Sequence, residues 1–339
     1  MHGRAYRRPE RYTDPKIIMD EKLRIVFFGT PEFAVASLDM LVKNGYHVVG
    51  IVTAPDKPAG RGLELKMSAV KEYANSKNLH VLQPENLKSE EFLAQLKGLN
   101  PNLGIVVAFR KLPREVWGFP KLGTFNLHAS LLPHYRGAAP INWAIINGEK
   151  ESGVTTFFLD DEIDTGKIIF RAKENIKEED TAGDLYARLM NDGSDLVLKT
   201  VRAIESGTYT PEDQSSLLKP NEKIKLAPKI FKDDCKINWK KKTDNVYDFI
   251  RGLSPYPTAW TEIQKENETL SLKVFKCIKE IVAHENEIGS IYTDGKTFVK
   301  IAVKEGFIHL LDLQLAGRKK MNIEEFLRGF SFEGWKINL

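Results

Sequence analysis

Residues 124–140 read T-F-N-L-H-A-S-L-L-P-H-Y-R-G-A-A-P, a stretch that starts as a buried strand and ends in a turn-rich segment. Alternate residues of a β-strand share a face, so Asn126 and His128 point to one side and Phe125 and Leu127 to the other. A lone histidine on a strand is more often structural than catalytic. An amide and an imidazole on one face, however, suit a reaction that builds negative charge on an oxygen and moves a proton.

This strand is one of a series. Apolar runs such as L-R-I-V-F-F, V-V-G-I-V-T-A and L-G-I-V-V-A-F alternate with segments of helical periodicity as far as residue 208. The pattern predicts a doubly wound, mostly parallel, Rossmann-like α/β sheet. Thr181 and Asp184 have the spacing of a capping box at the start of the last helix of this region. Ligands of such sheets bind outside the carboxyl ends of the strands, which is where His128 is expected.

The composition changes after residue 208. Residues 209–230 are rich in proline and lysine, and we interpret them as a linker. Residues 231–339 contain short β-rich runs separated by turn signals, which predict a small OB-like β-barrel. We therefore expect an α/β domain at residues 20–208 and a barrel domain after the linker. The Arg-rich residues 1–19 are interpreted as a disordered extension.

The overall composition is that of a globular protein, with 339 residues, 42% hydrophobic residues and a net charge of +4. No window approaches the run of about 18 apolar residues that a membrane span requires. The N-terminus does not resemble a secretory signal, so we expect a cytoplasmic protein. Cys235 and Cys277 form no motif and are interpreted as reduced thiols, with no metal site.

The first strand is followed by the turn Gly29-Thr30-Pro31-Glu32, which contains one glycine where a dinucleotide-binding turn has three. The chain also contains no phosphate-binding GxxxxGK[ST] loop. These absences disfavour a nicotinamide enzyme.

A further polar candidate is Asp164 in D-D-E-I-D-T-G-K. Taken alone this motif indicates a turn, but near a strand histidine the Asp164 carboxylate could orient the imidazole.

These motifs together resemble those of the folate-dependent formyltransferases. The resemblance rests on N-L-H-A-S-L-L-P, on Y-R-G-A-A-P and on D-T-G about thirty residues later. It also includes I-V-F-F-G-T-P-E-F-A, A-P-D-K-P-A-G-R-G and L-L-D-L-Q-L-A-G-R-K-K-M, and it extends from about Leu23 to Met321. It implies transfer of the formyl group of 10-formyltetrahydrofolate to the α-amine of methionyl-initiator-tRNA, for translation initiation. The enzyme is expected to be a monomer without a metal.

The resemblance also implies roles for particular residues. Asn126, His128 and Asp164 correspond to the catalytic set, and Arg61 to a contact with the acceptor end of the tRNA. The segment expected against the folate consists of Ser130, Leu131, Leu132 and Pro133. The barrel domain is expected to bind tRNA, with lysine clusters such as the one that follows Arg318.

Two loops depart from the family pattern. Phe109–Pro113, expected beside the pteridine of the folate, is shorter than usual, and Asp161–Ile163 is bulkier and more acidic.

Three alternatives stay open: formylation of a nucleotide-sugar amine, a formyltransferase of purine synthesis, and a non-catalytic RNA-binding protein. The Arg61 loop argues against the first, the length of the chain against the second, and the polar set at Asn126, His128 and Asp164 against the third.

Overall fold

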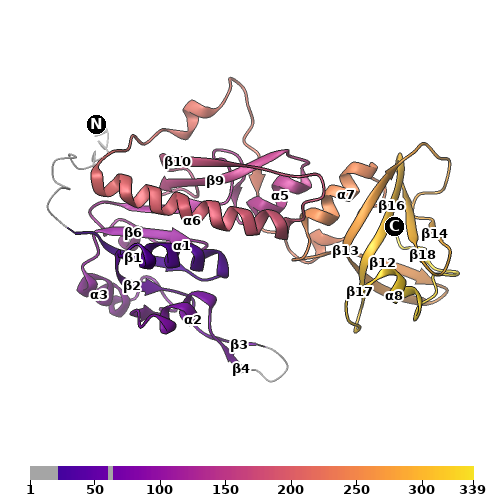
Figure 1. Ribbon diagram of the computed structural model, residues 1–339, viewed down its shortest axis with the longest axis horizontal. Helices are drawn as coiled ribbons and strands as arrows, with labels where there is room; N and C mark the ends of the chain where they lie inside the picture. The colour runs from indigo at the N-terminus through magenta and orange to yellow at the C-terminus, as the bar shows by residue number, and fades with distance from the viewer. Residues whose placement is uncertain (1–21, 60–63) are drawn as a thin grey trace, which may run out of the picture. The chain divides into compact units, whose positions relative to one another are not determined.

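The computed structural model describes residues 22–59 and 64–339 (Figure 1). The extension expected at residues 1–19 and the predicted tRNA contact Arg61 lie outside the described residues. The chain divides into two compact units, which are treated one at a time below. The first consists of the described residues up to His128 with Thr155–Ala172 and Met190–Leu218, and the second of Ala129–Val154, Lys173–Leu189 and Lys219–Leu339.

A seven-stranded sheet forms the centre of the α/β fold, in the order β10-β9-β7-β6-β1-β2-β5. Strands β5, β2, β1, β6 and β7 run parallel, and β9 pairs antiparallel with β7. The predicted doubly wound, mostly parallel sheet is thus confirmed. The strands are β1 (Arg24–Gly29), β2 (His47–Val52), β5 (Val81–Leu82), β6 (Leu103–Val107), β7 (Thr124–His128), β9 (Glu151–Phe158) and β10 (Ile168–Asn175).

Three helices of this fold begin at side-chain caps, whereas the helices that start at Glu32 and Arg114 follow Pro31 and Pro113 and have no side-chain cap. Ser68 and Ser89 accept hydrogen bonds from backbone N–H groups three residues later, and Thr181 and Asp184 form the reciprocal capping box that their spacing predicts. Strands β3 (Lys57–Ala59) and β4 (Glu64–Lys66) pair antiparallel with each other. The helices are α1 (Glu32–Lys43), α2 (Ala69–Ser76), α3 (Glu90–Leu99), α4 (Arg114–Trp117) and α6 (Ala182–Ser206).

Helix α6 packs closely on strand β7. A methyl group added at Gly193 would lie 2.7 Å from Cδ2 of Leu127, so a glycine is needed where helix and strand meet. In the same buried layer, the hydroxyl of Thr200 in α6 and the hydroxyl of Thr156 in β9 form a hydrogen bond of 2.8 Å. Because Leu127 faces α6, the strand alternation turns Asn126 and His128 to the opposite face of the sheet.

The second unit contains an antiparallel sheet in the order β14-β15-β16-β13-β12-β18, with β17 paired to β16. Its core includes the buried Trp239, whose indole N–H donates to the Thr261 hydroxyl at 2.9 Å. This small barrel-like sheet confirms the fold predicted for the carboxyl part. Its strands are β12 (Ala259–Lys265), β13 (Glu268–Ile281), β14 (Ile291–Thr293), β15 (Val299–Val303), β16 (Gly306–Leu315), β17 (Met321–Asn322) and β18 (Lys336–Ile337).

Shorter elements complete the second unit. Strand β11 lies in the segment that we interpret as a linker, and it pairs in parallel with β8. The domain boundaries expected from the sequence remain a prediction. These elements are α5 (Pro140–Ile146), α7 (Thr243–Gly252), α8 (Ile323–Leu327), β8 (Arg136–Gly137) and β11 (Leu226–Ala227).

Within residues 22–59 and 64–339, no helix is both long enough and apolar enough to cross a lipid bilayer.

The close contact between α6 and β7 can be tested by substitution. Gly193→Ala should lower the free energy of unfolding by up to about 2 kcal/mol, because overpacking against Leu127 costs about 1–3 kcal/mol and helix propensity returns about 0.5–1 kcal/mol of it. Urea titration measures the change. The matched control is Gly98→Ala in α3, where nothing lies within 4 Å of the new methyl group. That control should gain about 0.5–1 kcal/mol from helix propensity, and equal effects at both sites would contradict the packing argument.

Candidate active site

His128 and Asp164 are brought together although they belong to different parts of the sheet. Nδ1 of His128 lies 3.9 Å from Oδ2 of Asp164, and the side chains are only 7% and 13% exposed. His128 is the last residue of β7, and Asp164 lies in the loop between β9 and β10. In the antiparallel register Phe158, the last residue of β9, lies opposite Phe125. The loop must therefore carry Asp164 back toward the far end of β7.

The path of this loop is fixed by three features. Asp164 has a φ of 57°, in the left-handed region that aspartate tolerates better than most non-glycine residues and that turns the chain sharply. A Cβ at Gly166 would collide with the carbonyl oxygen of Phe158, so this position requires glycine. The buried Gln214 donates from Nε2 to the carbonyl oxygens of Asp164 and Gly166, at 2.9 Å each. Together they hold the Asp164 carboxylate beside His128.

Gln214 is a positioning residue that the sequence analysis missed. It lies in the segment interpreted as a linker, 50 residues after Asp164. A glutamine in a polar, proline-containing segment carries no periodic or motif signal, so nothing in the sequence indicates its partners. Its burial, with only 3% of its surface exposed, identifies it only once the fold is known.

Asn126 is the third member of the predicted set. It occupies the middle of β7, on the same face as His128, and its Oδ1 atom is buried without a hydrogen-bond partner among the described residues. An unpaired buried polar atom costs about 1–3 kcal/mol, so most such atoms in folded proteins have a partner. A carboxamide can also turn to present its amino group at the same position. This arrangement is expected of a group that bonds to a ligand.

The segment predicted to lie against folate begins two residues after His128. Ser130, Leu132 and Pro133 are buried, and only Leu131 is partly exposed. The Ser130 hydroxyl donates to the carbonyl oxygen of His134 at 2.7 Å, which closes the segment into a turn. Its hydroxyl therefore shapes the segment, and the segment can meet a ligand through its backbone and the Leu131 side chain.

The shortened loop Phe109–Pro113 is held in place by contacts within the first unit. Phe109 packs on Phe28 near the end of β1, with ring centroids 5.9 Å apart. Arg110 donates from its guanidinium to the carbonyl oxygens of Pro84 and Glu85, the second at 2.8 Å. These contacts fix the loop at the carboxyl edge of the parallel strands, the edge at which the sequence predicts ligand binding.

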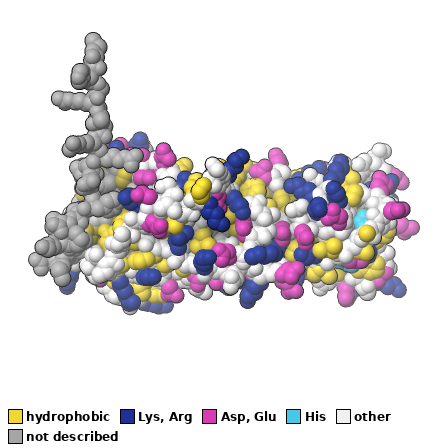
Figure 2. Space-filling view, turned by 90° about the horizontal axis from the view of Figure 1, so that it is seen from above, with side chains coloured by type: hydrophobic (Ala, Val, Ile, Leu, Met, Phe, Trp, Pro, Cys, Tyr) yellow, Lys and Arg dark blue, Asp and Glu magenta, His cyan; other side chains and the backbone are white. Residues whose placement is uncertain are grey.

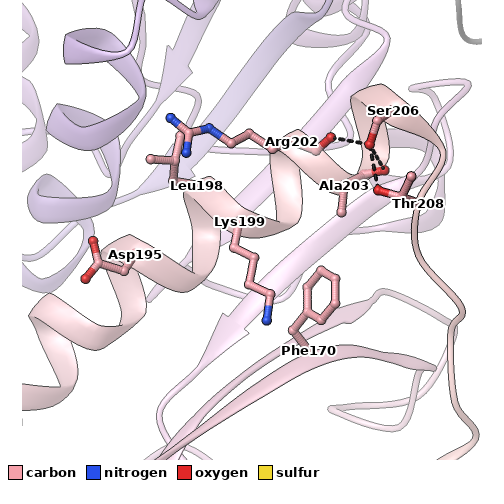
Figure 3. A pocket seen from close by; sticks show the side chains of 8 residues that line it. All are labelled: Phe170, Asp195, Leu198, Lys199, Arg202, Ala203, Ser206 and Thr208. Carbon is pink, nitrogen blue, oxygen red and sulfur yellow. Dashed lines mark hydrogen bonds between the residues drawn. The ribbon is translucent and has the colours of Figure 1, made fainter.

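A cavity of about 570 Å³ lies elsewhere in the first unit, along the C-terminal half of α6 (Figure 3). The Lys199 side chain extends toward the Phe170 ring, with Nζ 4.5 Å from the ring centroid. None of the predicted site residues lines it, so it is not the candidate active site. Its lining consists of Phe170, Asp195, Leu198, Lys199, Arg202, Ala203, Ser206 and Thr208.

Comparison with known families accounts for both parts of the chain. Residues 23–201 match the family described as formyl transferase, and residues 229–331 match the family described as formyl transferase, C-terminal domain.

Two curated relatives align over nearly their whole length. Methionyl-tRNA formyltransferase of Flavobacterium johnsoniae is 56% identical over 312 residues, covering 92% of this chain and 98% of the relative. Methionyl-tRNA formyltransferase of Bacteroides thetaiotaomicron is 52% identical over 320 residues, covering 94% and 99%.

Solved structures share the fold at lower identity. An N-formyltransferase from Helicobacter canadensis, crystallised with folinic acid and dTDP-3-aminofucose, has a TM-score of 0.59 and 22% identity, covering 88% of this chain and all of that one. HypX from Aquifex aeolicus, in complex with tetrahydrofolic acid, has a TM-score of 0.59 and 18% identity, covering 91% and 48%.

The role of Gln214 gives a prediction about stability. Gln214→Ala should lower the free energy of unfolding by about 1–3 kcal/mol, because two buried carbonyl groups lose their donor. Urea titration measures the effect. Gln264→Ala is the matched control, since the Gln264 amide bonds to one carbonyl group in an exposed hairpin, and it should change the stability little. A Gln214 variant as stable as this control would remove Gln214 from the support of the Asp164 loop.

Proposed function

This chain belongs to the formyl transferase family, and from that premise we propose that it transfers the formyl group of 10-formyltetrahydrofolate to the α-amine of methionyl-initiator-tRNA. The product, N-formylmethionyl-tRNA, serves translation initiation. The observation that carries the chemistry is the approach of the His128 imidazole and the Asp164 carboxylate to 3.9 Å, on the sheet face that also presents Asn126. The choice of acceptor is supported by the 52–56% identity to relatives named methionyl-tRNA formyltransferase.

Asn126 fits the role of a donor to the formyl oxygen. A bound formyl donor supplies an electrophilic carbon, and negative charge develops on its oxygen when an amine attacks. The Asn126 carboxamide is placed by a buried strand and has a buried polar atom without a partner among the described residues. A fixed donor of this kind is commonly worth about 10²–10³ in rate, because it needs no reorganisation during the reaction.

His128 and Asp164 form the group that moves protons. The attacking amine must lose a proton, and the departing nitrogen of the folate must gain one. The negative Asp164 carboxylate stabilises the positive charge that His128 carries when protonated. The burial of both side chains strengthens this attraction relative to water. At 3.9 Å the two atoms are beyond direct hydrogen-bond distance, so a small shift or a bridging water joins them.

The second unit is proposed to bind the tRNA backbone. Lysines and arginines on the face shown in Figure 2 are interspersed with aspartates and glutamates. In the predicted cluster Lys319 pairs with Glu325 and Lys320 with Asp312, each at 2.9 Å. Both lysine side chains are well exposed, so the pairs contribute little to stability and each lysine can exchange its carboxylate for a phosphate. The proposed acceptor-end contact, Arg61, lies outside the described residues.

A nucleotide-sugar amine is the alternative acceptor. The Helicobacter canadensis enzyme, crystallised with such a sugar nucleotide, shares the fold at 22% identity. That likeness concerns the fold alone, whereas the relatives above 50% identity extend over both parts of the chain. We therefore propose the tRNA acceptor, and further propose that the enzyme works in the cytoplasm as a monomer.

The test of this function compares acceptors. With 10-formyltetrahydrofolate as donor, the protein should formylate methionyl-initiator-tRNA and leave a dTDP-amino sugar unmodified, as measured by mass spectrometry of the products. His128→Ala and Asp164→Ala should each lose most of kcat while retaining tRNA affinity, because both residues act on protons at the reacting atoms.

Asn126→Ala is the informative companion variant. It should reduce kcat by about 10²-fold or more with little change in folate affinity, because its donor is needed mainly in the transition state. Formylation of the sugar amine alone would replace the proposed acceptor. Near-normal kcat in the His128 or Asp164 variant would remove that residue from the catalytic set.

A second prediction concerns the cluster at Arg318, Lys319 and Lys320. Replacing all three by alanine should weaken tRNA binding and flatten the dependence of log Kd on log salt by about 0.7–0.9 per lost phosphate contact. Filter binding at several salt concentrations measures this slope. The control replaces Lys77, Lys88 and Lys97, exposed lysines of the first unit, and removes the same charge. Equal slopes in the two variants would exclude a local footprint at Arg318–Lys320.

A further inference from the structure

The segment Lys219–Pro228, interpreted from its composition as a linker, is bound along the chain that follows the proposed folate segment. Strand β11 pairs in parallel with β8, with Leu226 opposite Arg136. The Tyr135 N–H donates to the carbonyl oxygen of Lys225 at 2.6 Å, and further along Ala139 N–H donates to Ala227 at 3.2 Å. We refer to Lys219–Pro228 as the strap. All of its contacts described here lie within the second unit.

A half-buried carboxylate, that of Glu149, connects the strap to Tyr135. The Lys225 ammonium and the Tyr135 hydroxyl both donate to the same oxygen, Oε1 of Glu149. Tyr135 is 6% exposed, and burial together with Glu149 raises the pKa of its hydroxyl. Burial alone would raise the pKa of Glu149, but the hydrogen bonds from Lys225 and Tyr135 outweigh it and hold that pKa below its usual range. The carboxylate thus stays charged and joins the two segments.

His134 is held by the strap on both sides of its ring. The Lys225 backbone N–H donates to Nδ1 at 3.3 Å, and Nε2 lies 3.2 Å from Oε1 of Glu222. With Nδ1 accepting, the ring proton is on Nε2 and is donated to Glu222. The carbonyl oxygen of the same residue accepts the Ser130 hydroxyl at 2.7 Å. One residue therefore joins the strap to the first residue of the proposed folate segment.

The backbone beneath the strap adopts a conformation that requires it. Tyr135 has a φ of 61°, which a non-glycine residue keeps only where neighbouring contacts hold it. Gly137 has a φ of 126°, and a Cβ there would collide with the carbonyl oxygen of Ala227. The strap thus approaches too closely for any side chain at residue 137. It accepts a hydrogen bond from the Tyr135 backbone N–H, and Lys225 binds the Glu149 carboxylate that also accepts the Tyr135 hydroxyl.

We propose that the strap is a positioning element for the formyl-donor site: through Lys225, Glu149 and His134 it holds Ser130–Pro133 in the shape that binds the folate. This inference rests on the proposed function, because it takes that segment to contact the folate. From the sequence alone, the lysines of the strap would be interpreted only as contacts with the tRNA backbone. The strap gives Lys225 a different role, which is to shape the loop without contacting either substrate.

The test measures folate affinity in the absence of tRNA. Isothermal titration with folinic acid, a stable formyl folate, compares Lys225→Met with Lys223→Met. Both variants remove one positive charge from the strap, but Lys223 is exposed and has no side-chain hydrogen bond or ion pair among those found in the structure. Lys225→Met should weaken binding about tenfold, the equivalent of one charge-assisted hydrogen bond, and Lys223→Met should leave it unchanged. Lys225→Arg should retain most of the affinity.

Glu149→Gln separates positioning from direct contact. If Lys225 bound the carboxylates of the folate directly, removal of the competing Glu149 charge would leave the affinity unchanged or raise it. The proposal expects the opposite, a weaker affinity with kcat close to that of the unmodified protein once folate is saturating. The same variant should be cleaved faster by trypsin after the lysines of the strap, as mapped by mass spectrometry, because the strap detaches.

Two outcomes overturn the proposal. One is an unchanged folinic acid affinity in Lys225→Met, and the other is an unchanged or raised affinity in Glu149→Gln. If Lys225→Met does not fold, as judged by its thermal transition, Glu149→Gln alone decides. Failure of the unmodified protein to formylate methionyl-tRNA would overturn the proposed function instead, and the tRNA-free titration distinguishes that failure from a failure of the strap.

Discussion

The approach of Asp164 to His128 is the constraint on which the rest of the site depends. Strand β9 runs antiparallel to β7, so by its register alone it would leave the following loop at the start of β7 and away from His128. The loop reaches the imidazole because it turns tightly against the backbone of Phe158, where only glycine fits, and because Gln214 ties down two of its carbonyl groups. The proposed catalytic pair is thus held together mainly by backbone contacts of the loop that carries Asp164.

The same principle applies within the second unit, to the segment proposed to bind folate. The turn that begins at Ser130 is closed by a hydroxyl-to-carbonyl bond, and the left-handed residue Tyr135 follows it. The Asp164 loop and the segment around Tyr135 therefore each contain turn or left-handed backbone that is held by residues distant in the sequence, Gln214 and Lys225. Strain of this kind persists only where surrounding contacts over-determine it, and it is commonly found at functional sites.

Much of this could be predicted from the sequence, because it depends on periodic patterns. The alternation along β7 places Asn126 and His128 on one face, and the series of apolar strands predicts the parallel sheet, as the structure confirms. The Asp164 carboxylate could be proposed from its motif as a partner of the strand histidine, and the resemblance adds its catalytic role. Gln214 and the pairing of β8 with β11 could not be predicted, because hydrogen bonds between distant irregular segments leave no periodic signal. The roles of the site residues remain predictions.

The close passage of Ala227 over Gly137 also bears on where this protein can be divided. Composition predicts a domain boundary near residue 208, and a fragment or chimera joined there contains every residue predicted for the α/β domain. Such a junction would separate Arg136–Gly137 from its paired strand and the Glu149 carboxylate from Lys225. Chimeras that exchange barrels between relatives are therefore better joined after Pro228, so that the strap stays with the strand and the carboxylate that it contacts.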